Sequence, residues 1–137
     1  MSEAAGSCHC GAVEIRIGEA PEYINECNCS LCSKHGALWG YFEPDRVRVF
    51  GATEIYCRSD RAEPTAALHF CAVCGCTTHW TATPAFIRKF GIANRMGVNF
   101  RLFEPSSFKG VELRFPDGRA WDGSADWDFV RPPTKMP

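Results

Sequence analysis

The chain has 137 residues, of which 45% are hydrophobic and 23% charged, and its net charge is -1. This length fits one domain, and the composition excludes a disordered or collagen-like chain. No apolar run approaches the roughly 20 residues that cross a bilayer, and the near-neutral charge argues against a general binder of phosphate backbones. We therefore expect neither a membrane nor a nucleic-acid partner, and the sequence leaves the oligomeric state open.

The first residues, MSEAAGSC, contain neither the basic nor the apolar region of a signal peptide. We therefore expect a cytoplasmic location.

Short alternating segments separated by glycine and proline predict β-strands. The strands are expected at 12–17, 46–50, 95–103 and 111–115, the last followed by a Pro-Asp-Gly turn. Helix is expected only as short turns at 30–35 and 105–109. The prediction is one mainly β domain over residues 1–123, followed by an extended or frayed tail at 124–137.

The nine cysteines are the most informative feature of the sequence. Their odd number and the missing export signal argue against a disulfide scaffold and favour metal binding or chemistry. Eight of them form three clusters, and Cys57 stands alone in a predicted strand, where we expect a small buried apolar residue. The clusters are Cys8-His9-Cys10, Cys27-Asn28-Cys29-Ser30-Leu31-Cys32 and Cys71-Ala72-Val73-Cys74-Gly75-Cys76.

One closed zinc site can be built from two of these clusters. A C-x2-C pair turns the backbone so that two thiolates converge on one ion, and two such pairs make a structural zinc site. The simplest combination joins Cys8 and Cys10 to Cys71 and Cys74. Its metal affinity would be partly folding free energy, because it ties together distant segments.

The middle cluster then offers three thiolates, Cys27, Cys29 and Cys32, without an obvious fourth ligand. Three protein ligands and an open position are typical of a catalytic zinc site. Ferredoxin spacings do not occur, so zinc is favoured over an iron–sulfur cluster. The candidate fourth ligands are Cys76, His35, His69 and His79.

A stretch without acidic residues, 64–103, contains Arg88, Lys89, Arg95 and Arg101. These cations could offset the negative charge of a four-thiolate zinc site or bind an anionic small molecule. The alternative is that they form a solvated strand face.

Three segments, GSCHCGAVEIRI, ECNCSLCSKHG and HFCAVCGCTTHW, together resemble the glutathione-dependent formaldehyde-activating enzyme family. The resemblance implies a β-tent fold of small coiled sheets around zinc. It implies that Cys8, Cys10, Cys71 and Cys74 hold structural zinc and that Cys27, Cys29 and Cys32 hold catalytic zinc.

The activity implied by the resemblance is a carbon–sulfur lyase or synthase reaction that joins glutathione to formaldehyde. The partners would be a small-molecule thiol and an aldehyde, and the four cations above are our candidates for the glutathione carboxylates. Two other functions remain compatible with the cysteine pattern: a non-enzymatic zinc-binding interaction module, and a redox sensor that uses Cys27, Cys29 and Cys32 as reactive thiols.

Overall fold

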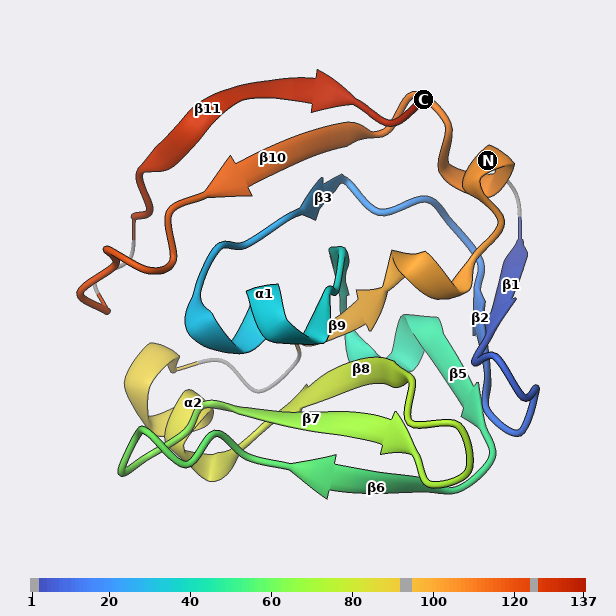
Figure 1. Cartoon of the computed structure of the whole chain (residues 1–137), viewed down its shortest axis with the longest axis horizontal. Coiled ribbons are helices and arrows are strands. Elements are labelled where there is room, and N and C mark those ends of the chain that lie inside the picture. The colour runs from blue at the N-terminus through green and yellow to red at the C-terminus, as the bar shows by residue number, and fades with distance from the viewer. Residues whose placement is uncertain (1–2, 92–94, 124–125) are drawn as a thin grey trace.

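The computed structural model describes residues 3–91, 95–123 and 126–137, and β-strands dominate it (Figure 1). The expected mainly β fold is confirmed. A three-stranded antiparallel sheet contains β1 (Ala4–Ser7), β2 (Glu14–Ile17) and β5 (Val47–Phe50), in that order. The second sheet has the order β11 (Phe129–Lys135), β10 (Glu112–Pro116), β3 (Tyr23–Asn25), β4 (Trp39–Phe42), β9 (Met96–Asn99), β8 (Thr77–Ala82), β7 (Ala66–Cys71) and β6 (Thr53–Tyr56).

The alternation of apolar residues predicted for 12–17 is present in and next to β2. Val13, Ile15 and Ile17 are buried on one side, because alternate side chains of a strand face the same layer. Ile15 and Ile17 join Ile24, Val98 and other residues in the main apolar core. This core lies between the two sheets and fixes their relative position.

The strand expected at 95–103 is shorter than predicted. Strand β9 ends at Asn99, whose side chain accepts a hydrogen bond of 3.1 Å from the Arg101 backbone N–H and begins a 3-10 helix at Phe100–Leu102. The Asn99 amide also donates to the Thr77 carbonyl. This local capping ends the alternation, so the prediction was wrong beyond Asn99.

The helix expected at 30–35 is present as α1 (Ser30–His35). Cys29 caps its first turn, since its sulfur accepts a hydrogen bond from the Cys32 N–H, and Gly36 ends it with a left-handed φ of 64°. In the view of Figure 1, α1 lies between strand β3 and strands β7 and β8. Two further 3-10 turns lie at Pro44–Arg46 and Pro105–Phe108.

A second α-helix, α2 (Pro84–Phe90), was not predicted from the sequence. Thr83 caps it, Pro84 occupies its first turn, and Gly91 ends it with a φ of 69°. These are ordinary start and stop signals, and they could have identified the helix.

The segment expected to be a tail contains β11, which pairs antiparallel with β10. Strand β10 in turn pairs in parallel with β3, the strand that leads into the middle cysteine cluster. Residues of β11 are all exposed, but the strand belongs to the large sheet. In the described ranges, no helix is long and apolar enough to span a membrane.

Cys57 contradicts the prediction that it is buried. It follows β6, which is the last strand at one edge of the large sheet, and its side chain is exposed. Only one side of an edge strand is covered by a neighbour, and in β6 most residues face solvent.

Candidate metal centres

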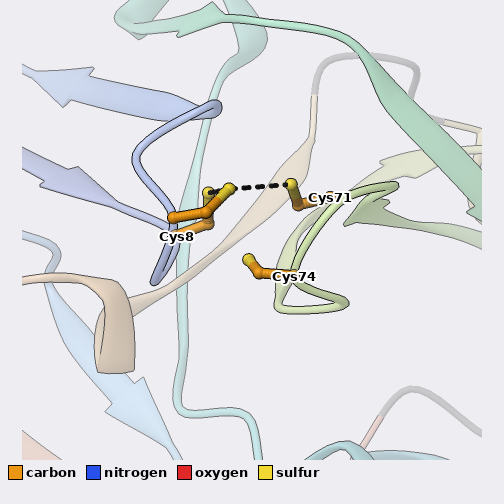
Figure 2. A group of neighbouring side chains, drawn as sticks. Cys8, Cys71 and Cys74 are labelled. Atoms are coloured by element: carbon orange, nitrogen blue, oxygen red, sulfur yellow. Dashed lines mark hydrogen bonds between the residues drawn. The ribbon is translucent and has the colours of Figure 1, made fainter.

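Two loops bring the sulfurs of Cys8, Cys10, Cys71 and Cys74 within 4.8 Å of one another. Figure 2 shows Cys8 facing Cys71 and Cys74 across the space between the loops. The sulfurs of Cys8 and Cys10 are 3.7 Å apart, and those of Cys10 and Cys71 are 3.6 Å apart. Four sulfurs at 2.3 Å from a tetrahedral zinc ion would be about 3.8 Å from one another. The group therefore fits a four-thiolate zinc site.

Backbone amides of the two loops donate hydrogen bonds to sulfurs of this group, and they favour the thiolate form of Cys71 and Cys74. The N–H groups of Val13 and Val73 donate to the sulfurs of Cys8 and Cys71, at 3.3 and 3.4 Å. Amides of Cys76 and Cys10 lower the pKa of the Cys74 thiol to about 5, and those of Cys74 and Val73 lower the pKa of Cys71. A hydrogen bond to a thiolate stabilises its charged form, which is the form that binds metal.

Cys76 lies beside this group and is not one of its four members. Its sulfur accepts a hydrogen bond of 3.5 Å from the His9 N–H, and the side chain packs against Cys8 and Cys71. Cys76 therefore links the two loops from outside the ring of four sulfurs.

The sulfurs of Cys27, Cys29 and Cys32 form a second group, also within 4.8 Å of one another. Cys27 lies in the loop after β3, Cys29 caps α1, and Cys32 lies one turn into that helix. The Cys27 sulfur accepts a hydrogen bond from the Cys29 N–H at 3.4 Å. Cys29 and Cys32 are three residues apart, which is close to one helical turn, so their side chains lie on the same side at the start of α1.

The second group cannot hold three thiolates without a cation. Hydrogen bonds from Cys27 and Cys32 lower the pKa of the Cys29 thiol to about 2. Hydrogen bonds with Cys27 and Cys29, followed by burial, raise the pKa of Cys32, and the hydrogen bond with Cys29 raises that of Cys27. Full ionisation of all three sulfurs requires a positive ion among them, and three thiolates are a donor set that suits zinc.

None of the four candidate fourth ligands joins this group, and all four lie in the described part of the chain. His35 Nδ1 is 2.7 Å from the Thr77 hydroxyl. His69 and His79 stack on each other with ring centroids 4.1 Å apart, and each bonds to a threonine hydroxyl. Cys76 lies beside the first group. The second group therefore has three sulfur ligands among the described residues.

The turn that follows β10 contacts the loop that carries Cys27 and Cys29. The Asn28 side chain donates a hydrogen bond of 2.8 Å to Asp117 and accepts one of 2.9 Å from the Arg119 N–H. Gly118 lies so close that a Cβ atom on it would be 2.4 Å from the Cys27 sulfur. The sequence predicts the Pro-Asp-Gly turn, but no local signal marks Asn28, Asp117 or Gly118 as neighbours of the sulfurs.

The three cysteines of the second group, Cys27, Cys29 and Cys32, line part of a cavity of about 1020 Å³. Three of the four predicted cations, Arg88, Lys89 and Arg95, line the same cavity. It also has cationic residues that the sequence did not single out, Arg58, Arg61 and Arg114. Among the described residues of the lining, Glu63 and Asp126 are the acidic ones.

Arg101, the fourth predicted cation, lies elsewhere. It lines a separate cavity of about 340 Å³ on the other side of Cys27 and Cys32, and its side chain donates to the Gly36 carbonyl at the end of α1. The structure therefore does not bring Arg101 together with Arg88, Lys89 and Arg95.

Asn25 and Tyr41 lie in the cavity wall on adjacent strands. The Asn25 side-chain amide donates a hydrogen bond of 3.0 Å to the Tyr41 hydroxyl. Burial raises the pKa of Tyr41 above its ordinary range, so this hydroxyl stays protonated. Tyr41 also packs with Cys32 and Trp80 in a small apolar cluster.

Comparisons with known proteins find relatives of this chain in sequence and in structure. A Halomonas elongata protein that carries the name of glutathione-dependent formaldehyde-activating enzymes is 36% identical over 88 residues. These residues are 58% of this chain and 55% of that protein, so the chain spans about half the length of this relative. A crystal structure of a Rhodobacter sphaeroides protein superposes with a TM-score of 0.57 and 31% identity, covering 73% of this chain and 87% of the other.

The model of one protein family, described as glutathione-dependent formaldehyde-activating enzyme, matches residues 3–99. The matched part includes both groups of converging cysteines and ends with β9. The chain belongs to the glutathione-dependent formaldehyde-activating enzyme family.

Proposed function

We propose that this protein joins glutathione to formaldehyde or a related small aldehyde beside Cys27, Cys29 and Cys32. The observation that supports the proposal most is the position of these three sulfurs. They line a large cavity, and no fourth protein ligand joins them among the residues described. In the proposal, Cys8, Cys10, Cys71 and Cys74 hold a structural zinc ion and stabilise the fold.

Zinc held by Cys27, Cys29 and Cys32 would supply a Lewis acid and an open position at which a thiol loses its proton. The chain's own contribution is to hold three sulfurs on one side of that position. Asn28 and Gly118 keep the loop of Cys27 and Cys29 in place, through the contacts with the turn after β10. A fixed geometry of this kind lowers the entropic cost of bringing two reactants together.

Charge in the cavity suits glutathione, which has two carboxylates and one ammonium group near neutral pH. Arg61, Lys89 and Arg95 line the cavity, and so does Arg58, whose guanidinium forms an ion pair with Asp60 at 2.6 Å. Cationic residues outnumber acidic ones in the described lining, so the cavity attracts an anion. We propose that these side chains bind the glutathione carboxylates.

The reaction is an addition and has no leaving group. A bond forms between the glutathione sulfur and the aldehyde carbon, and the electron pair of the C=O π bond moves to oxygen. That oxygen gains one proton, which balances the proton lost by the thiol. Tyr41, protonated and in the cavity wall, is a hydrogen-bond donor for the oxygen. A glutathione-dependent reaction also fits the reducing cytoplasm, where thiols stay free.

The proposal is tested by exchange NMR of formaldehyde and glutathione with zinc-loaded protein. We expect the wild type to accelerate formation and breakdown of S-(hydroxymethyl)glutathione over buffer that contains free zinc. The Cys29→Ser variant should lose most of this acceleration. Cys57→Ser is the matched control, because Cys57 is exposed and belongs to neither sulfur group, and it should behave as wild type. Equal rates with wild-type protein and with buffer would overturn the proposal.

A further inference from the structure

The cavity beside Cys27, Cys29 and Cys32 is much larger than formaldehyde requires. Its volume of about 1020 Å³ is at the upper end of the roughly 300–1,000 Å³ typical of sites for drug-sized ligands. Formaldehyde has two non-hydrogen atoms. Even with glutathione bound, the aldehyde end of the cavity therefore has room for a larger substituent.

Part of this cavity is bounded by an aromatic wall, which we define as Trp80, Phe86, Phe90, Trp121 and Trp127. The ring centroids of Trp80 and Phe86 are 5.9 Å apart, those of Phe86 and Phe90 4.8 Å, and those of Trp121 and Trp127 5.3 Å. The Lys89 ammonium joins the two halves, at 5.5 Å from the Phe90 ring and 5.4 Å from the Trp121 ring. The five rings are half-buried, and the Lys89 ammonium lies between the two groups of rings.

The aromatic wall begins next to the sulfur group. Tyr41 and Trp80 pack in one apolar cluster with Cys32, and their ring centroids are 6.2 Å apart in an edge-to-face arrangement. From Trp80 the wall continues to Phe86 of α2. A substituent on an aldehyde carbon held at the sulfurs would therefore extend along these rings.

Glutathione does not explain this wall. Its three residues, glutamate, cysteine and glycine, include no ring and no large apolar side chain, whereas aromatic side chains bind best to other rings and flat apolar groups. The cationic side chains of the cavity already suit its carboxylates. The wall is thus complementary to the aldehyde component.

Two members of the wall come from a part of the chain outside the family match. Trp121 and Trp127 follow β10, while the family model ends at residue 99. The same segment contains Asp117 and Gly118, which contact the sulfur loop. The segment beyond the family match therefore contributes two of the rings that line the cavity.

We propose that the aldehyde for which this site is shaped carries an aromatic ring of benzaldehyde size, with formaldehyde as its smallest substrate. The inference rests on the proposed thiol addition. Glutathione sulfur bonds to the aldehyde carbon, the carbonyl π electrons pass to oxygen, and oxygen takes the proton that the thiol loses. The product is the aromatic hemithioacetal of glutathione.

Calorimetric binding to the zinc-loaded full chain tests the inference with two stable thioethers, S-benzylglutathione and S-methylglutathione. We expect the benzyl compound to bind on the order of 10- to 100-fold more tightly, as for other groups that fill an apolar pocket. Trp121→Leu and Phe86→Leu should each reduce this ratio several-fold. Phe50→Leu is the control, since Phe50 is exposed on the small sheet and does not line the cavity.

The outcomes separate this inference from the proposed function. Equal affinity of wild type for both thioethers, or no binding of either, overturns the inference, whatever the protein does with formaldehyde. A benzyl preference that both wall variants retain also overturns it, provided that thermal unfolding shows the variants folded. A benzyl preference lost in both variants supports the aromatic site. If formaldehyde exchange is not accelerated in that case, the proposed addition fails, and the site remains one for a glutathione conjugate with an aromatic substituent.

Discussion

The side-chain amide of Asn28 donates a hydrogen bond of 2.8 Å to the carboxylate of Asp117, which lies 89 residues further along the chain. Asn28 stands between two of the three sulfur residues that line the cavity. Asp117 begins the turn that leads from β10 toward β11. The bond thus connects the turn between the two C-terminal strands to the loop that carries the second sulfur group.

Removing this bond should weaken metal binding at one centre only. In Asp117→Ala, Asn28 loses its carboxylate partner and the loop that carries Cys27 and Cys29 loses a support. We expect zinc affinity of the second group to fall about 10- to 100-fold, the range for loss of groups that orient metal ligands. Titration with a competing chelator measures the two affinities separately. Asp45→Ala is the control and should change neither affinity, because Asp45 is exposed and belongs to neither sulfur group. An equal fall at both centres would contradict the role of Asp117.

A methyl group at position 118 should disturb the same centre by crowding. In Gly118→Ala the new Cβ would be 2.4 Å from the Cys27 sulfur, so the loop must shift at a cost of about 1–3 kcal/mol. We expect the zinc content to fall toward one ion per chain. Gly18→Ala is the matched control, because no atom lies within 4 Å of a Cβ at that position. Full zinc content in Gly118→Ala would show that the loop tolerates displacement.

Loss of one ligand of the first group should destabilise the whole fold. Cys8 is 2% exposed, and its group joins the loop after β1 to the loop between β7 and β8. We expect Cys8→Ser to lower the free energy of unfolding by several kcal/mol, because part of the metal affinity is folding free energy. Urea unfolding measures this, with Cys57→Ser as the control. Similar stability of the two variants would mean that the first group is not structural.

Acid should destabilise the protein through the stacked pair of His69 and His79. Burial, and then the neighbouring His69, lower the pKa of His79 from 6.5 to about 4. The unfolded chain therefore takes up this proton near pH 6.5, whereas the folded chain does so only near pH 4. The contribution of neutral His79 to the free energy of unfolding is complete above pH 6.5. It is lost as the pH falls toward 4, and the loss is about 1 kcal/mol at pH 5.5.

The measurement is the free energy of unfolding at pH 7 and pH 5.5 for wild type and His79→Gln. Zinc release in acid affects both proteins, so the difference between their pH dependences isolates the histidine. The variant should lose about 1 kcal/mol less than wild type. His9→Gln, at an exposed position, should follow the wild type, and an identical pH dependence of all three proteins would contradict the assignment.

The sequence predicted well those features whose causes are local. Cys29 and Cys32 are three residues apart on one short helix, so their convergence follows from helical geometry. Val13, Ile15 and Ile17 alternate in a strand and are buried together. The spacing of metal ligands predicts that Cys8 and Cys10 join Cys71 and Cys74, and the structure brings these four sulfurs together.

Features that depend on packing between distant segments could not be derived in this way. Nothing near Asn28 in the sequence indicates that Asp117 binds its side chain, because the parallel pairing of β3 with β10 brings the two together. The exposure of Cys57 depends on β6 being an edge strand, which is a property of the whole sheet. The position of Arg101 changed because Asn99 caps a 3-10 helix where alternation predicted a strand.

The central claim is that each chain holds two zinc ions, one closed by four cysteines and one held by three. Native mass spectrometry of wild type and Cys29→Ser, purified without chelator, tests it most directly. We predict two zinc ions per chain in the wild type and one in a folded Cys29→Ser variant. One zinc ion in both proteins would contradict the claim, because the second group would then not be a metal centre.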